Sequence, residues 1–144
     1  MDNHLVLAAL GAGKTGIVDE IARSASESKC NIADSRMVVM GQEFSLIMMV
    51  SGTWDAIAKF ETQVPMLERR LNLSIITKRT AQREPQRESM PYNVDVIALD
   101  NPGIVHEIAN FFASQGINIE SLETSNYAAP HTGSPMFALS MVVN

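Results

Sequence analysis

The feature that most constrains the fold of this chain is an internal repeat. Residues 16–22 (Gly-Ile-Val-Asp-Glu-Ile-Ala) return 87 residues later, at positions 103–109, as Gly-Ile-Val-His-Glu-Ile-Ala. Further along, residues 44–50 (Phe-Ser-Leu-Ile-Met-Met-Val) resemble residues 137–143 (Phe-Ala-Leu-Ser-Met-Val-Val), and an Asn-Ile pair recurs between these anchors. Three matches in the same order indicate that one module has been duplicated.

Each copy of the module has the sequence pattern of a strand, a helix and a hairpin. In the first copy, apolar residues recur at three- and four-residue spacing from Ile17 to Ala25, which is typical of an amphipathic helix. Gly41-Gln42 separates two apolar runs and predicts a tight hairpin turn, whereas Pro65 should break or kink the second helix. The elements expected in the first copy are, in chain order, a strand at 5–10, a helix at 17–25, strands at 37–40 and 44–50, a helix at 54–71 and a strand at 73–77.

This order of elements predicts an α+β fold of the ferredoxin-like βαββαβ kind, with one antiparallel sheet and both helices on one face. We expect a first domain at residues 1–79, a second at 92–144, and a charged linker with two prolines at 80–91. The second copy stops where the first has Ser51, so it lacks its last helix and strand. Because this leaves apolar surface and a sheet edge uncovered, we expect that the natural chain is longer or that another subunit completes the sheet.

The composition indicates a folded protein with an acidic surface. Hydrophobic residues make up 46% of the chain, charged residues 19%, and the net charge is −5. Nucleic-acid binding needs a basic surface, which an acidic chain of this kind does not offer. Basic residues cluster only where glutamates interrupt them, which predicts a solvated linker: Lys78, Arg79, Arg83 and Arg87 with Glu84 and Glu88. We therefore expect no direct contact with nucleic acid.

The cysteine content and the N-terminus suggest a compartment. Cys30 is the only cysteine, so no disulfide can form within the chain, and a reducing environment is expected. The first residues lack a basic segment, and the apolar run ends at Leu10, which is too short for a signal peptide or a membrane span. We therefore predict a cytoplasmic protein.

The segment Gly13-Lys14-Thr15 is the most tempting catalytic motif, because it loosely fits a phosphate-binding loop. In such loops backbone amides cradle phosphates, the lysine neutralises them and the threonine reaches the metal. The predicted hairpin indicates an antiparallel sheet, however, whereas phosphate loops belong to parallel sheets. The equivalent loop of the second copy, residues 100–103, also lacks both lysine and threonine. Nucleotide binding therefore stays a minor alternative.

Other catalytic or metal chemistry has no candidate residues in the sequence. The three histidines, His4, His106 and His131, are scattered and share no helical turn with one another or with Cys30. No spacing supports a nucleophile with a neighbouring base. We therefore expect no catalytic activity, no metal and no cofactor.

The remaining candidate for function is the loop between the first strand and the first helix of each copy. A glycine opens each helix and leaves backbone N–H groups directed at the loop, where the helix dipole favours a carboxylate. We also expect the asparagine that begins the second strand to lie near this loop. We therefore predict an amino-acid pocket in each copy, formed by Ala12, Gly13, Lys14, Thr15, Gly16, Ile17, Asn31 and Ile32 in the first and by Asp100, Asn101, Pro102, Gly103, Ile104, Asn118 and Ile119 in the second. The simpler alternative is that the glycines only cap helices and the asparagines only form turns.

At these residues the sequence resembles ACT domains, which are small regulatory modules that bind amino acids. The family pattern is Asp-Arg-Pro-Gly-Ile-Val followed by Gly-x-Asn-Ile, and residues 100–105 (Asp-Asn-Pro-Gly-Ile-Val) and 116–119 (Gly-Ile-Asn-Ile) match it closely. The first copy departs from the pattern, because residues 13–16 (Gly-Lys-Thr-Gly) lack the aspartate and the proline. The resemblance implies an amino-acid ligand and a regulatory role.

A longer resemblance, through residues 30–36, 41–48, 51–57 and 78–80, is to tandem ACT proteins that repress transcription indirectly. It implies binding to an activator protein of the glycine cleavage operon, with glycine as the effector and no contact with DNA. A homodimer is also expected, because sheet edges are exposed. The alternative is a structural or oligomerisation module that binds no small molecule.

Overall fold

A computed structural model describes residues 2–81 and 90–144 of the 144-residue chain. The chain divides into two compact units, residues 1–84 and 85–144, here called the first and the second unit. The expected domain boundaries stay a prediction, and most of the expected linker at 80–91, with Arg83, Glu84, Arg87 and Glu88, lies outside the described residues. Within the described ranges, no helix combines the length and apolarity needed to cross a membrane.

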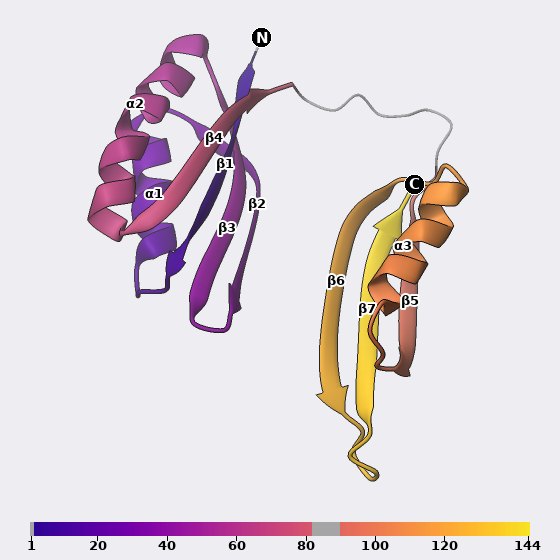
Figure 1. Cartoon of the computed structure of the whole chain (residues 1–144). Coiled ribbons are helices and arrows are strands. Elements are labelled where there is room, and N and C mark those ends of the chain that lie inside the picture. The colour runs from indigo at the N-terminus through magenta and orange to yellow at the C-terminus, as the bar shows by residue number, and fades with distance from the viewer. Residues whose placement is uncertain (1, 82–89) are drawn as a thin grey trace. The chain divides into compact units, whose positions relative to one another are not determined.

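The first unit contains one sheet and two helices (Figure 1). The sheet has the strand order β2-β3-β1-β4, and every neighbouring pair is antiparallel. This arrangement confirms the predicted ferredoxin-like α+β fold. Its elements are β1 (Asn3–Ala12), α1 (Ile17–Glu27), β2 (Asn31–Met40), β3 (Glu43–Gly52), α2 (Trp54–Leu71) and β4 (Leu73–Thr80).

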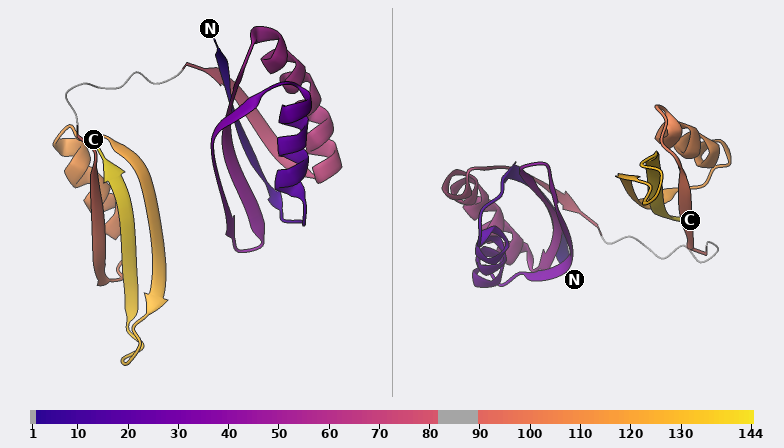
Figure 2. Two further views of the ribbon diagram at one scale, coloured as in Figure 1. Left: turned by 180° about the vertical axis from the view of Figure 1, so that it is seen from behind. Right: turned by 90° about the horizontal axis from the view of Figure 1, so that it is seen from below.

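Both helices of the first unit cover the same face of its sheet (Figure 2). Alternate residues of β1 and β3 point to that face, as the two-residue period of strands requires, and are almost completely buried. Phe60 of α2 is the largest fully buried side chain in this core. The strand residues that contribute to the core are Leu5, Leu7 and Ala9 of β1 and Phe44, Leu46, Met48 and Val50 of β3.

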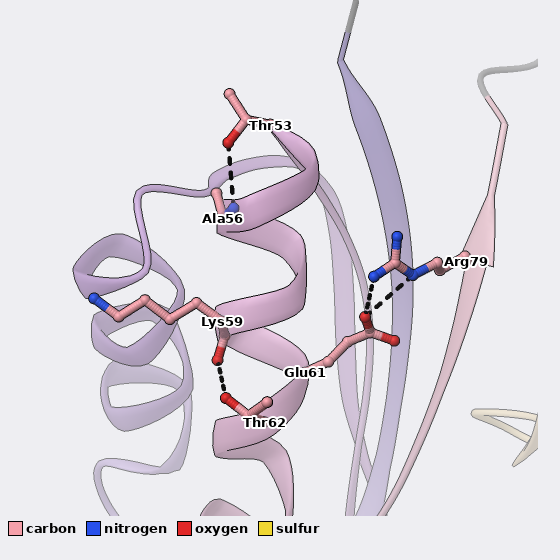
Figure 3. Close-up of polar contacts among 6 residues, drawn as sticks. All are labelled: Thr53, Ala56, Lys59, Glu61, Thr62 and Arg79. Carbon is pink, nitrogen blue, oxygen red and sulfur yellow. Dashed lines mark hydrogen bonds and ion pairs between the residues drawn. The ribbon is translucent and has the colours of Figure 1, made fainter.

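The sequence predicts a break or a kink at Pro65; helix α2 continues through this residue, so the break is wrong. The helix is anchored on both sides of the proline, because Val64 and Leu67 are buried against the sheet. At its start the Thr53 hydroxyl accepts a hydrogen bond from the Ala56 N–H at 3.2 Å (Figure 3). On β4, the Arg79 guanidinium donates to the Glu61 carboxylate at 2.6 Å, which fastens the helix to the edge strand.

The second unit repeats the first part of this fold. It consists of β5 (Tyr92–Leu99), α3 (Ile104–Ser114), β6 (Ile119–Ala128) and β7 (Pro135–Val143), with the strand order β5-β7-β6. Even the irregularity in strand pairing recurs, between Ile32 and Asp34 in β2 and between Ile119 and Ser121 in β6. Among the described residues, the last element of the second unit is β7, the strand equivalent to β3.

The duplication also predicts a stabilising substitution, Lys29→Gly. Lys29 follows α1 with φ +68°, and the equivalent residue after α3 is Gly116 with φ +71°. The N–H groups of Lys29 and Gly116 donate to the same relative carbonyls, those of Ser26 and Ala113. Because a Cβ is strained at positive φ, Lys29→Gly is expected to raise the free energy of unfolding of the first unit by about 0.5–1 kcal/mol. Chemical denaturation measures this change, and a loss of stability would contradict the shared end geometry.

Candidate ligand-binding loops

The two strand-to-helix loops have the same backbone geometry. Gly16 has φ +89° and ψ +2°, and Gly103 has φ +89° and ψ 0°. In each case the glycine carbonyl accepts the N–H of the residue four positions on, Glu20 or Glu107, at 3.0 Å. Neither helix has a side-chain cap at its start. Only glycine adopts this conformation without strain, so the glycines hold both helix starts in the same open form.

In the first unit the loop borders an open hollow of about 600 Å³. The predicted residues Gly13, Lys14, Thr15, Gly16 and Ile17 line one side of it. The Ile17 side chain itself is buried in the core, so its contribution to the hollow is mainly backbone. Ala12, which was also predicted, ends β1 and is not among the lining residues.

The opposite side of this hollow consists of residues that the sequence analysis did not predict. Met37 and Val39 of β2, Gln42 of the hairpin turn and Phe44 of β3 line it. The antiparallel register explains their position, because Ala12 pairs with Glu43, which in turn pairs with Met40. The Gly41-Gln42 turn was a signal that could have located them, since it sets which end of the hairpin lies beside the loop.

In the second unit the loop carries a carboxylate in a defined position. The Asp100 carboxylate accepts a hydrogen bond from the Asn126 side-chain amide at 3.1 Å, and its backbone N–H donates to the Pro135 carbonyl at 3.0 Å. The following residues, Asn101 and Pro102, are exposed. Ile104 packs partly buried against the core of the second unit. Asn126 was missed by the sequence analysis because it lies late in β6.

The two loops therefore differ in polarity although their backbones agree. The repeat aligns Asp100 with Gly13 and Asn126 with Val39. A polar pair at the loop of the second unit thus stands where the first unit has a glycine and an apolar side chain. The first loop borders a hollow that Lys14, Asp19 and Gln42 line together with apolar residues, whereas in the second the loop itself carries an oriented carboxylate.

The expectation that Asn31 lies near the loop of its own unit is wrong. Asn31 pairs with Ser51, which pairs with His4 at the start of β1, whereas the loop follows the other end of β1. The ten residues of β2 separate the two sites by about 30 Å at roughly 3.3 Å per residue. Helix α1 carries the chain back along the length of the strands, so β2 begins at the end of the sheet opposite the loop. Ile32, the next residue, shares this position.

Asn118 of the second unit lies equally far from its own loop. It precedes β6, and it exchanges two backbone hydrogen bonds with Asn144 after the end of β7, at 3.1 and 2.9 Å. Ile119 pairs with Val143 and packs on the core of this unit. In both units, therefore, the predicted asparagine and the predicted loop lie at opposite ends of one sheet.

The structure also bears on the chemical alternatives. Strand β1, which leads into Gly13-Lys14-Thr15, lies between two antiparallel neighbours, unlike the parallel setting of phosphate-binding loops. No group of three or more histidine, cysteine or acidic side chains gathers within the described residues in a way that could hold a metal. Cys30 is buried, and burial raises the pKa of its thiol, so little reactive thiolate forms near neutral pH.

Comparison with known proteins extends these observations. The family model described as "ACT domain" matches residues 3–78. The glycine cleavage system transcriptional repressors of Escherichia coli (strain K12) and Shigella flexneri are each 39% identical to this chain over 122 residues. The matched region is 83% of this chain and 63% of each relative, so the chain spans less than two thirds of the length of these relatives.

Two crystal structures resemble the whole chain. One is of a protein provisionally named as a glycine cleavage system transcriptional repressor, with 30% identity, a TM-score of 0.74, and coverage of 100% of this chain and 81% of the other. The second is of an unknown protein from Galdieria sulphuraria, with 26% identity, a TM-score of 0.76, and coverage of 99% and 82%. The duplicated modules, the glycine-led loops and these matches lead to one conclusion. The chain belongs to the ACT domain family.

Proposed function

We propose that this chain is a non-enzymatic regulator that senses an amino acid, glycine first among them, and represses transcription without touching DNA. In this proposal it acts in the cytoplasm on an activator protein of the glycine cleavage operon. The names of the relatives support the choice of operon, and the net charge of −5 supports indirect control. The single observation that carries the ligand proposal is the carboxylate of Asp100, oriented by Asn126 beside a glycine-led helix start.

The loop of the second unit offers a partner to each charge of a small zwitterion. The N–H groups at the start of α3, which no side chain caps, and the helix dipole attract the ligand carboxylate. The Asp100 carboxylate accepts the ligand ammonium, and its hydrogen bond to Asn126 holds it in place. The first-unit loop at residues 12–17 stays in the proposal as a second site, where Gly13 stands in place of Asp100, Asp19 is the carboxylate that lines the hollow, and Val39 makes the wall apolar.

In this proposal, Asn118 of one copy of the chain contributes to the ligand site of a second copy. Strand β6 is an edge strand, and an antiparallel partner strand from another copy would reverse its direction. The start of one β6 would then lie beside the end of the other. That pairing brings Asn118 of one copy to the loop at residues 100–103 of the second copy, where its amide completes the ligand cage. The homodimer of this proposal thus supplies what a single unit lacks.

The variant Asp100→Ala tests the proposed site. Losing a charge-assisted hydrogen bond to the ligand ammonium should weaken glycine binding by about 1.5–3 kcal/mol, which is roughly a 10- to 150-fold rise in Kd by isothermal calorimetry. The control Asp95→Ala removes an equal charge from an exposed position on β5 and should leave the affinity unchanged. Equal affinities of wild type and Asp100→Ala would exclude Asp100 from the site. Asn118→Ala in the same titration should lose about as much, if a second copy contributes it.

A structural module without a ligand is the second candidate function. It is favoured by β2, in which all ten residues are exposed along one edge of the first sheet, as in a strand that awaits a neighbour. A thermal-shift screen with the twenty amino acids separates the two functions, because a bound ligand raises the melting temperature by mass action. A response to none of them would favour the structural module over amino-acid sensing.

A further inference from the structure

The sheet of the first unit has one face that its helices leave uncovered, here called the open face (Figure 2). Directly paired residues of neighbouring strands share a face, and the pairs Val6–Met49, Ala8–Ile47 and Leu10–Ser45 lie at the centre of this one. Leu10 and Ile47 keep 55% and 51% of their surface exposed, and Ile76 of β4, which pairs with Ala8, keeps 72%. The centre of the open face is therefore apolar and in contact with solvent.

One row of the equivalent face in the second unit is polar. The repeat aligns Ala8 with Asp95, Arg36 with Glu123, and Ile47 with Ser140. Asp95, Glu123 and Ser140 are exposed, and they lie side by side on the equivalent face, because Ser140 pairs with both of the others. At this row the second unit carries two carboxylates and a serine, whereas the first carries Ala8, Ile47 and the cation Arg36; Ile97 and Leu99 stay exposed and apolar on the same face of the second unit. In the first unit the apolar residues occupy the centre of the face, and exposed apolar patches of this kind mark interaction sites.

We propose that the open face of the first unit packs against the open face of a second copy of this chain. A two-fold axis parallel to the strands, between β3 and β1, places β3 of one copy over β1 of the other. Ile47 then faces the second copy's Ala8, and Met49 faces the second copy's Val6. Leu10 faces the second copy's Ser45. Each contact joins a larger side chain to a smaller one, so the face is complementary to itself, as an isologous dimer interface must be.

The charges at the rim agree with the same axis. It places β2 over β4 of the second copy and keeps each residue at its level along the strands. Asp34 pairs with Met49, and Lys78 pairs with Val6, so both stand at one level on opposite edges of the sheet. Asp34 of each copy therefore faces the second copy's Lys78 in two symmetric ion pairs. Asp34 already pairs with Arg36 at 3.3 Å, and a side chain that is 57% exposed can accept a further cation.

The size of the face suits a modest dimer interface. Strands about 4.8 Å apart that rise about 3.3 Å per residue give a four-stranded, ten-residue face roughly 600 Å² in projection, against the roughly 800 Å² that each partner buries in a standard interface. Twisted sheets pack face to face at about −30°, so the centres of the two faces lie closest together and their corners stay solvated. The proposed dimer should therefore dissociate on dilution rather than behave as an obligate one.

The test replaces open-face residues by those that the second unit carries at the same positions. Ile47→Ser and Ala8→Asp, alone and together, are expected to change the mass of the full chain in light scattering from twice 15.7 kDa to 15.7 kDa. Circular dichroism and melting temperature should change little, because both residues are outside the core. The control Ile97→Ser removes an isoleucine that is even more exposed, 69% against 51% for Ile47, from the equivalent face of the second unit and should leave the mass unchanged.

Reversing the charges tests the axis. Lys78→Asp and Asp34→Lys should each shift the dimer to higher concentrations, and the double variant should restore it. A wild-type chain that stays monomeric up to millimolar concentration, or a dimer that survives Ile47→Ser with Ala8→Asp, would overturn the proposal, and a double variant that fails to recover would overturn the placement of β2 over β4. This dimer contact belongs to the first unit and is separate from the β6 pairing of the proposed function. Measured without amino acid, it can fail while glycine still binds, and the reverse also holds.

Discussion

Phe60→Ala is expected to lower the free energy of unfolding of the first unit by about 3–5 kcal/mol, the largest effect of a single truncation in this chain. Phe60 is completely buried in the middle of α2, among the buried residues of both helices and the sheet. Alanine would remove most of its apolar contacts and leave a cavity that the rigid sheet cannot close. A loss of this size approaches the whole stability of a small domain, so this unit should be largely unfolded at 37 °C.

Hydrogen exchange resolved by segment checks this result. Exchange should accelerate throughout residues 3–80, while residues 92–143 keep their protection, because the two units have separate cores. Phe111→Ala is the matched control, since the same side chain on α3 is 58% exposed and should cost less than about 1 kcal/mol. Equal effects of the two variants, or a loss of protection in both units, would contradict the separate cores.

Gly11→Ala is expected to destabilise the first unit by about 1–3 kcal/mol, although it adds a single methyl group. A Cβ at Gly11 would lie 2.9 Å from the Asn72 carbonyl oxygen and 3.2 Å from the Leu73 Cα, which are backbone atoms, and 2.8 Å from the Leu73 Cδ2. Gly11 pairs with Leu73 where β4 begins, so relief would require β4 to shift away from β1. Thermal or chemical denaturation measures the loss.

Gly13→Ala is the control for this effect, because its Cβ would meet Phe44 Cβ at 3.6 Å, an ordinary contact. The internal repeat gives an independent reason to expect that alanine destabilises the unit at position 11. The residue equivalent to Gly11 is Ala98, and the described part of the second unit has no strand equivalent to β4 beside it. If Gly11→Ala were as stable as Gly13→Ala, the close approach of β4 to β1 would not constrain this position.

Much of the fold could be predicted because its signals are local. The helical spacing from Ile17 to Ala25 lies within α1, and Gly41 has the positive φ, +59°, that a tight hairpin favours. Strand lengths were less predictable. The apolar pattern located only residues 37–40 of β2, and the repeated Asn-Ile pair alone marked its start at Asn31, because an edge strand exposed along its length carries no apolar alternation. The helix does not break at Pro65, because packing on both sides of the proline outweighs the loss of one hydrogen bond.

The residues of the candidate sites also divide into those with a local sequence signal and those placed by strand register. The glycines at 16 and 103 could be identified because the positive φ at a helix start is a property of one residue. Asn126 and Val39 could not, because their place beside the loops depends on how three strands align over many residues. Asn31 and Asn118 were misplaced for the same reason, since sequence proximity to a strand end does not say which end of the sheet that is.

The sequence by itself determined that this chain is a duplicated βαβ-hairpin module with glycine-led helix starts, because repeats, periodicity and glycine conformation are written in short segments. Only the tertiary structure decided what stands beside each loop and which sheet face is left open. Those features arise from antiparallel register and from the return path of a helix, which bring together residues far apart in the chain. The polarity of the two loops and of the two open faces follows from that pairing.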